Sequence, residues 1–520
     1  MIRLARISLL RLNILEQRNR VTGMDTEQAT DPLDTIWGDD LIGRRGDAKF
    51  LQEFLCGKIA DRKRLRQTGS YVLNIDAEWG AGKSFFLDRF ARQLEHSGHV
   101  VARVNAWRDD HLDDPFIAIL SSIDEALKPF VKKDGKLLDA WRGVKQNAIP
   151  VAGKLGAGLL KTVVKRYVGK EALDAVEDLM TDSVGFDEDG VDGERSASEQ
   201  IIEGAVSETI VQIESVIDAG AQKLIDAFNG KNKATETFKG KLGKAIAALE
   251  GTRETPLFIL VDELDRCRPS YAIALLERVK HLFDADNVAF VFATNSGELQ
   301  HIVSGAYGPS FDGFRYLKRF FDRTYLLAEP DAEKFIAVEI AAALDLAKLR
   351  APKDAVYFMI AGFSAYRSDL REIKHAIDLM SSVVSAWQHR IPVEMVLLFP
   401  LVMIFLRKGS VDRKEAVNLI PQSFVIDLGR SRSFYDGRSV ELTINVRQAY
   451  ADASDVMTSL EKAPRYGNSE DASTQTSYVR DIFVPEWNGV ARNGDKPSIQ
   501  ADLPRLIAYA GNLAKAGSAE

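Results

Sequence analysis

The chain has little cysteine and no long apolar run, and each absence excludes a class of protein. Its 520 residues contain only two cysteines, Cys56 and Cys267, too few for a disulfide framework or a zinc site built from cysteines. A membrane-spanning helix needs roughly twenty predominantly apolar residues. The two best candidates fail, because Ala148–Val168 contains four basic residues and Met395–Leu406 is too short. We therefore predict two reduced thiols, no transmembrane segment and a cytoplasmic location.

An excess of positive charge is also missing. Lys and Arg number 68 and Asp and Glu number 75, so the net charge is −7. This balance excludes a bulk polycation but is compatible with a local basic groove. The sequence contains no zinc knuckle or RNA-binding aromatic signature, and basic runs such as Lys161–Arg166 are short. Nucleic-acid binding is therefore possible but unsupported.

The first twenty residues, MIRLARISLLRLNILEQRNR, alternate basic and apolar side chains. They lack the apolar block and the small-residue cleavage site of a secretory signal. Two interpretations stay open: a basic surface helix that contacts anionic lipid, or upstream sequence before a true start at Met24, so that residues 1–23 are not protein. In either case we assign residues 1–37 to an N-terminal extension.

Short apolar runs alternate with amphipathic helical patterns along much of the chain. The expected strands are Tyr71–Ile75, Val100–Val104, Leu257–Val261, Val288–Ala293 and Thr324–Leu327. Strands that alternate with helices predict right-handed crossovers and a parallel sheet, hence an α/β fold. The continuously apolar run Leu257–Val261 predicts a strand buried on both faces and central in the sheet. A helix over Asp114–Lys128 is expected to end at Pro129.

The most specific motif lies between the first strand and the next helix. The segment Ala77-Glu78-Trp79-Gly80-Ala81-Gly82-Lys83-Ser84 matches G-x-x-x-x-G-K-[ST], except for alanine at the first position. In this pattern the glycines allow close approach of the backbone, and the loop N–H groups cradle phosphates. Lys83 is expected to reach the β- and γ-phosphates, and the Ser84 hydroxyl to ligate Mg²⁺. The predicted nucleotide-binding residues are Gly80, Ala81, Gly82, Lys83, Ser84 and Phe85.

A pair of acids follows the third expected strand, in the segment LFILVDELDRC. Ligands of open α/β sheets bind at the carboxyl ends of the strands, where this pattern places Asp262. Asp262 is expected to hold Mg²⁺ and Glu263 to polarise the attacking water. Two adjacent acids also occur in ordinary solvated loops, but their combination with the glycine-rich loop favours phosphoryl transfer from ATP.

Asn295 follows the neighbouring strand, in the segment VFATN. An amide at this place orients the water or a γ-phosphate oxygen. The alternative interpretation is a cap for the helix that begins near Gly297.

Together these stretches resemble the KAP family of P-loop NTPases, a branch of the additional-strand class with a catalytic acid after the Walker B aspartate. The resemblance covers about residues 38–385. It rests on DDLIGR (Asp39–Arg44), AEWGAGKS, NAWRDD (Asn105–Asp110), VDELDRCRPSYAIALLERVKHLF, FRYLKRFFDRTYLL (Phe314–Leu327) and SDLREIKHAID (Ser368–Asp378). The family usually has Asp at the position of Glu263, and Glu preserves the same chemistry.

The resemblance implies a P-loop core with a five-stranded, mainly parallel sheet flanked by helices. We assign the core to residues 38–131 and 252–330, a helical insertion to 132–251, a helical lid to 331–420 and a mixed C-terminal region to 421–520. Some family members have membrane helices at the place of the insertion. Here the insertion is charged and amphipathic, which predicts a soluble type, and its acidic loop DSVGFDEDGVDGE lacks the spacing of a calcium-binding EF-hand.

The resemblance also implies roles for three arginines. Arg371, in the lid, aligns with an arginine that senses the γ-phosphate, although a plain helix-surface charge is the alternative. Either Arg319 or Arg323 would act as an arginine finger across a subunit interface, and the sequence does not choose between the two. The alternative is that either arginine is structural.

The implied function is a bacterial, soluble ATPase that couples hydrolysis of Mg²⁺–ATP to conformational change or assembly. The resemblance points to anti-phage defence, with self-association and co-encoded protein partners. Two alternatives stay open: a nucleotide-dependent scaffold with little turnover, and a nucleic-acid-acting motor. A metallohydrolase is disfavoured, because His96 and His99 flank a Ser-Gly turn and a helical H-E-x-x-H is missing from the sequence.

Overall fold

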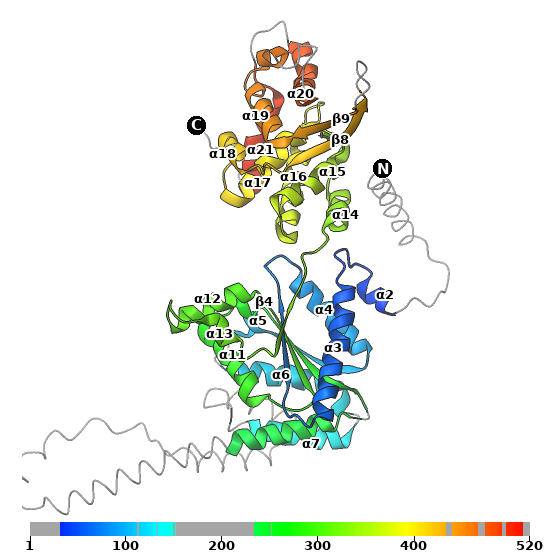
Figure 1. Ribbon diagram of the computed structural model, residues 1–520, viewed down its shortest axis with the longest axis vertical. Coiled ribbons are helices and arrows are strands. Elements are labelled where there is room, and N and C mark those ends of the chain that lie inside the picture. The colour runs from blue at the N-terminus through cyan, green and yellow to red at the C-terminus, as the bar shows by residue number, and fades with distance from the viewer. Residues whose placement is uncertain are drawn as a thin grey trace, which may run out of the picture.

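The computed structural model describes residues 32–111, 114–132, 134–148, 151, 233–250, 252–432, 439–465, 474–490 and 496–512. These residues form two bodies, one above the other in Figure 1, and the chain passes between them near residues 327–332. The acidic loop and the long amphipathic pattern of the expected insertion lie outside the described residues, as do residues 1–31.

A five-stranded sheet with parallel pairing forms the centre of the first body. Its strands are β1 (Tyr71–Asp76), β2 (His99–Asn105), β3 (Glu254–Asp262), β4 (Val288–Thr294) and β5 (Arg323–Leu326). The order β2-β3-β4-β1-β5 makes β4 the central strand and places β3 next to the edge. The expected central position of β3 is therefore wrong. The apolar runs of β3 and β4 are both buried on two faces, so apolar character alone does not distinguish the central strand from its neighbour.

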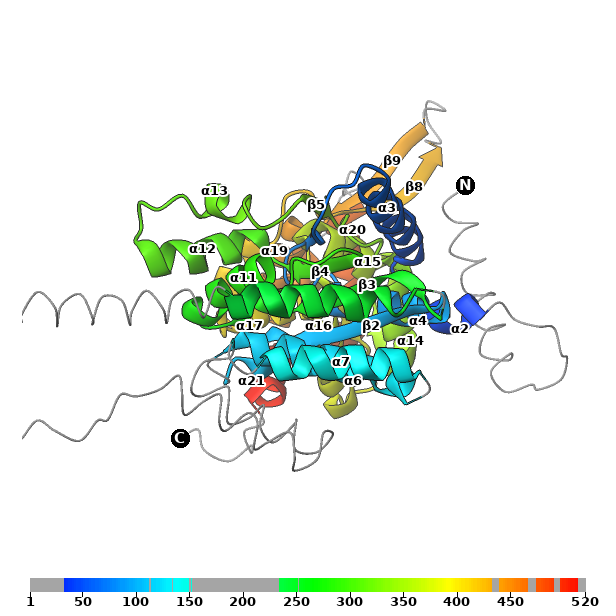
Figure 2. The same cartoon turned by 90° about the horizontal axis from the view of Figure 1, so that it is seen from below.

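Helices cover both faces of the sheet and make three layers. Alternation along β4 places Phe290 and Phe292 on one face and Ala289 and Ala293 on the other. The aromatic face packs against α6 (Pro115–Val131), α7 (Gly135–Ala148), α11 (Pro269–Leu282) and α12 (Ser296–Tyr307), and the opposite face against α3 (Arg45–Arg64) and α4 (Lys83–His96) (Figure 2). Because the strands are parallel, the segments after β1, β3 and β4 meet at one edge of the sheet.

Short elements complete this body: α2 (Pro32–Trp37), α5 (Ala106–Asp109), the 3₁₀ turn η1 (Leu264–Arg266), α13 (Gly313–Leu317) and a helix over residues 233–247. The helix α6 does not end at Pro129, as expected, but continues to Val131. Proline removes one backbone N–H donor, and at this position the helix ends within two further residues.

The second body is mainly helical around one hydrophobic cluster that extends from Ile336 to Ile507. Its elements are α14 (Glu333–Ala343), β6 (Leu349–Arg350), α15 (Ala355–Tyr366), α16 (Leu370–Ala386), β7 (Val393–Glu394), α17 (Met395–Lys408), α18 (Arg413–Leu419), β8 (Val425–Arg432), β9 (Ser439–Asn445), α19 (Val446–Val456), α20 (Thr474–Val490) and α21 (Leu503–Asn512). As expected, Met395–Leu406 lies in a core helix, although Pro400 is inside it. Among the described residues, no helix is long and apolar enough to cross a membrane.

Candidate functional site

The glycine-rich loop connects β1 to α4 at the carboxyl edge of the sheet. Gly80 and Gly82 have φ angles of 80° and 85°, in the left-handed region that favours glycine. Gly82 is also the N-cap of α4, so the first N–H groups of this helix point towards the loop. A Cβ atom at Gly80 would lie 2.4 Å from the carboxyl carbon of Asp369, at the start of α16. The loop therefore needs glycine here for both conformation and space.

Lys83 folds back over this loop. Its Nζ donates hydrogen bonds to the carbonyl oxygens of Ala77 (2.6 Å) and Glu78 (3.1 Å). Burial lowers the pKa of Lys83, and the nearby carboxylates of Asp265 and Asp262 oppose this shift. Hydrogen bonds from an ammonium to an anion are stronger than those to neutral carbonyls, so binding favours the exchange of these two partners of Lys83 for phosphate oxygens.

Asp262 ends β3 beside the first turn of α4. Burial raises the pKa of Asp262, and a hydrogen bond with the Ser84 side chain opposes that effect. A hydroxyl and a carboxylate side by side are ligands that Mg²⁺ accepts. The predicted metal-binding pair thus lies together in space.

Both carboxylate oxygens of Glu263 already have partners. The Asn105 side chain donates to Oε2 at 3.0 Å, and Arg266 forms an ion pair with Oε1 at 2.8 Å. The backbone of Glu263 adopts a left-handed conformation (φ 61°), which is uncommon for a residue other than glycine. Its side chain is thus held at the end of β3, and each of its two oxygens, with one partner in place, can accept a further hydrogen bond from a water.

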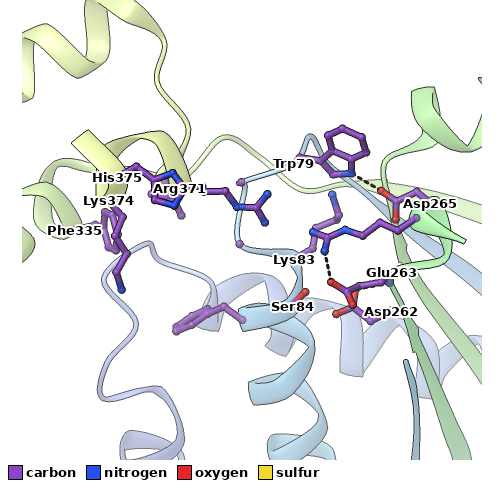
Figure 3. A pocket seen from close by; sticks show the side chains of 15 residues that line it. Trp79, Lys83, Ser84, Asp262, Glu263, Asp265, Phe335, Arg371, Lys374 and His375 are labelled. Carbon is purple, nitrogen blue, oxygen red and sulfur yellow. Dashed lines mark hydrogen bonds and ion pairs between the residues drawn. The ribbon is translucent and has the colours of Figure 1, made fainter. Parts of the chain in front are cut away.

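A cavity of about 340 Å³ joins these groups. The first body contributes Lys83, Ser84, Asp262, Glu263 and Asp265, and the second body contributes Phe335, Leu370, Arg371, Lys374 and His375. Figure 3 shows the two sets facing each other, with Arg371 from α16 directed towards the P-loop. Of the other predicted residues, Gly80, Gly82 and Phe85 also line the cavity.

The remaining predicted residues do not line the cavity. Ala81 accepts a hydrogen bond from Arg44 through its carbonyl oxygen (2.9 Å). Asn295 caps α12 with its side-chain oxygen, while its Nδ2 donates to Glu78 at 2.9 Å. Arg319 and Arg323 are exposed near β5, at the far edge of the sheet, and do not line the cavity.

Sequence reasoning missed Asn105, Arg266, Asp265, Lys374 and His375 as residues of this region. Asn105 and Glu263 are far apart in sequence and meet only because β2 and β3 pair in register, Asn105 beside Asp262. The signal for Asn105 was its place at the end of a strand. For Lys374 and His375 the signal was their spacing from Arg371 along one helix.

The parallel sheet, the glycine-rich loop at its edge and the acids at the end of β3 define an α/β P-loop NTPase fold. Residues 58–381, more than half of the chain, match a family domain described as the KAP family P-loop domain. The chain therefore belongs to the KAP family. No curated protein shows a significant match to the chain.

Proposed function

We propose that the protein is an ATPase that hydrolyses Mg²⁺–ATP in the cavity between the P-loop and α16. The observation that carries this proposal is the convergence of Lys83, Ser84, Asp262 and Glu263 on one cavity, with Arg371 on the opposite wall. A cavity of about 340 Å³ is within the range of small-molecule sites.

In the proposed complex, the backbone N–H groups from Gly80 to Phe85 hold the phosphates at the N-terminus of α4. Lys83 exchanges its two carbonyl partners for β- and γ-phosphate oxygens, and Arg371 approaches the γ-phosphate from the lid. Ser84 and Asp262 would hold Mg²⁺, which supplies charge stabilisation for the transferred phosphoryl group.

In the hydrolytic step, the Glu263 carboxylate accepts a proton from the attacking water. The water oxygen forms a bond to the γ-phosphorus while the bond to the bridging oxygen breaks, and ADP leaves with that electron pair. We assign Asn295 to orienting this water or a γ-phosphate oxygen through the second hydrogen of its amide, because the first is donated to Glu78.

The experiment compares nucleotide binding and phosphate release. We expect Lys83→Ala to lose both, because the loop then lacks its cation. Glu263→Gln should retain binding but lose turnover by at least about a hundredfold, since it removes the base and leaves the phosphate cradle intact. Glu329→Gln, a change at an exposed acid that does not line the cavity, is the matched control. Turnover that survives Lys83→Ala or Glu263→Gln would contradict hydrolysis at this site.

The wider proposal is that hydrolysis drives conformational change or assembly in cytoplasmic anti-phage defence in bacteria, with co-encoded partners. It is supported by the resemblance to the KAP family. In an assembly, the exposed Arg319 or Arg323 would serve as the arginine finger. Phage should plate less efficiently on cells that carry the wild-type protein than on cells that carry Glu263→Gln, and a pull-down with ATP-bound Glu263→Gln should identify the partners. Equal plating would refute the defence role.

A nucleotide-dependent switch with little turnover is the second candidate. The observation that favours it is the engagement of both Glu263 oxygens by Asn105 and Arg266. Self-association that ATP induces without phosphate release would support the switch over the ATPase.

A further inference from the structure

We propose that Asp265 is a positioning residue for the nucleotide: its carboxylate holds the P-loop, through Trp79, in the conformation that receives a triphosphate. The inference rests on the proposed function and assigns a role to a third acid that the motifs of that function do not use.

The first argument is a closed ring of hydrogen bonds. One oxygen of Asp265, Oδ2, accepts from the indole Nε1 of Trp79 at 2.7 Å and from the backbone N–H of Asn295 at 3.1 Å. The side chain of Asn295 in turn donates to Glu78 at 2.9 Å, and Glu78 precedes Trp79 in the chain. The ring therefore ties the P-loop to the turn after β3 and to the end of β4.

The second argument is that the loop has few other ties on this side. Between Ala77 and Gly82, its internal backbone bond is the long one from Ala81 to Glu78 (3.3 Å), and the Ala77 N–H donates to Thr294 at 3.2 Å. The Lys83 ammonium holds the carbonyl oxygens of Ala77 and Glu78, but these are the contacts that it gives up to phosphate in the proposed complex. Arg44 holds the carbonyl of Ala81 from the other side. Trp79 is 43% exposed, so packing alone does not fix its ring, and the hydrogen bond to Asp265 sets its direction. Figure 3 shows this contact at the rim of the cavity, above Lys83.

The third argument is electrostatic. A carboxylate next to a phosphate site repels the ligand unless its charge is used elsewhere. Asp265 is 5% exposed, directs one oxygen at two donors, and is the strongest of the nearby carboxylates in favouring the charged form of Lys83. Its charge therefore supports the lysine and the loop that hold the phosphates.

A residue that positions the phosphate cradle acts on the bound substrate and the transition state alike. Losing it should weaken binding and leave the rate at saturation nearly unchanged. This outcome is opposite to that of Glu263→Gln, which removes turnover and keeps binding.

The test measures the Kd of ATP by calorimetry, and kcat and KM by phosphate release, in the full-length protein. Trp79→Phe keeps an aromatic ring and removes the N–H donor, and we expect Kd and KM to rise about five- to tenfold with kcat within about twofold. Asp265→Ala should weaken binding at least as much, and adding Trp79→Phe to it should have no further effect, because the indole has already lost its acceptor. Asp265→Asn retains an acceptor oxygen and should restore part of the affinity.

Tyr307→Phe is the matched control, because it also removes one hydrogen-bond donor from an exposed aromatic side chain, and Tyr307 does not line the cavity. If the wild-type protein does not bind ATP, the proposed function and this inference both fall. If the wild type binds and hydrolyses ATP while Trp79→Phe changes Kd by less than twofold, the inference alone is overturned. It is also overturned if Trp79→Phe lowers kcat and leaves KM unchanged.

Discussion

Arg44 is a charged side chain with only 2% of its surface exposed. Its guanidinium donates to the carbonyl oxygens of Ala81, in the P-loop, and Ala328, after β5, at 2.9 and 2.8 Å. Arg44→Ala would leave these acceptors without a partner and open a space beneath the loop. We expect a loss of about 2–4 kcal/mol in the free energy of unfolding, measured by urea or thermal denaturation.

The neighbouring Arg45 provides the control for this change. Its side chain is 44% exposed and pairs with Asp34 at the surface. Exposed ion pairs contribute about 0–1 kcal/mol, so Arg45→Ala should cost less than about 1 kcal/mol. Equal losses in the free energy of unfolding for Arg44→Ala and Arg45→Ala would contradict a stabilising role for the buried guanidinium of Arg44.

Glu394 gives the protein a pH dependence of stability. Burial raises the pKa of Glu394 to about 7, although hydrogen bonds from Tyr478 and the Val396 backbone and the charge of Arg350 oppose this. Between the ordinary pKa of 4.5 and about 7 the folded state binds more protons than the unfolded state. Stability should therefore fall as the pH rises through this window, by about 3 kcal/mol in total.

Glu394→Gln tests this pH dependence, because glutamine keeps an acceptor for Tyr478 and does not ionise. Relative to the variant, the wild-type protein should lose stability from pH 4.5 to pH 8, as followed by denaturant titrations at each pH. Parallel stability curves for the two proteins would contradict a buried carboxyl with a raised pKa.

At the scale of elements, the junction between the P-loop and α16 depends on one glycine. Asp369 caps α16 by accepting from the N–H groups of Arg371 and Glu372, both at 2.8 Å. Gly80→Ala would place a methyl group 2.4 Å from this cap, at a backbone angle unfavourable for alanine. We expect the variant to bind nucleotide at least about tenfold more weakly and to lose about 1–2 kcal/mol of stability.

Gly57→Ala is the matched control for this glycine. Gly57 lies within α3, its side-chain direction is open, and its backbone is helical. Alanine should stabilise the helix there by about 0.5–1 kcal/mol and leave nucleotide affinity unchanged. Similar affinities for the two variants would refute the proposed crowding at α16.

The elements also show what sequence patterns specify and what they leave open. Alternation of apolar runs and helical periodicity was enough to locate β1 to β4, because a strand buried on both faces must be apolar throughout. The strand β5 was located by its short run Thr324–Leu327, although its side chains are mostly exposed. The order of β3 and β4 was not predictable in this way, since both runs are equally buried. The motifs located Lys83 and Asp262, but the contact between Asn105 and Glu263 depends on strand register.

At the scale of the whole molecule, the cavity lies between the two bodies, so a ligand there links their stabilities. Arg371 extends from the second body towards the P-loop (Figure 3), and Lys374 lines the same cavity. A ligand that binds only the folded protein stabilises it by RT ln(1 + [L]/Kd), so ATP should raise the melting temperature of the whole described fold.

Removing a cation of the lid should reduce the stabilisation by ATP without changing the stability of the nucleotide-free protein. Arg371 is exposed, so Arg371→Ala should leave the melting temperature without nucleotide nearly unchanged. Losing a charged contact to the γ-phosphate should weaken ATP binding about tenfold, which reduces the stabilisation at saturating ATP by about 1.4 kcal/mol. ADP lacks the γ-phosphate, so the stabilisation by ADP should be the same in Arg371→Ala as in the wild type. Lys408 is an exposed cation that does not line the cavity, so Lys408→Ala should change neither the stabilisation by ATP nor that by ADP. Equal losses with ADP and ATP would show that Arg371 does not distinguish the two nucleotides, and would make it a general phosphate contact of the lid.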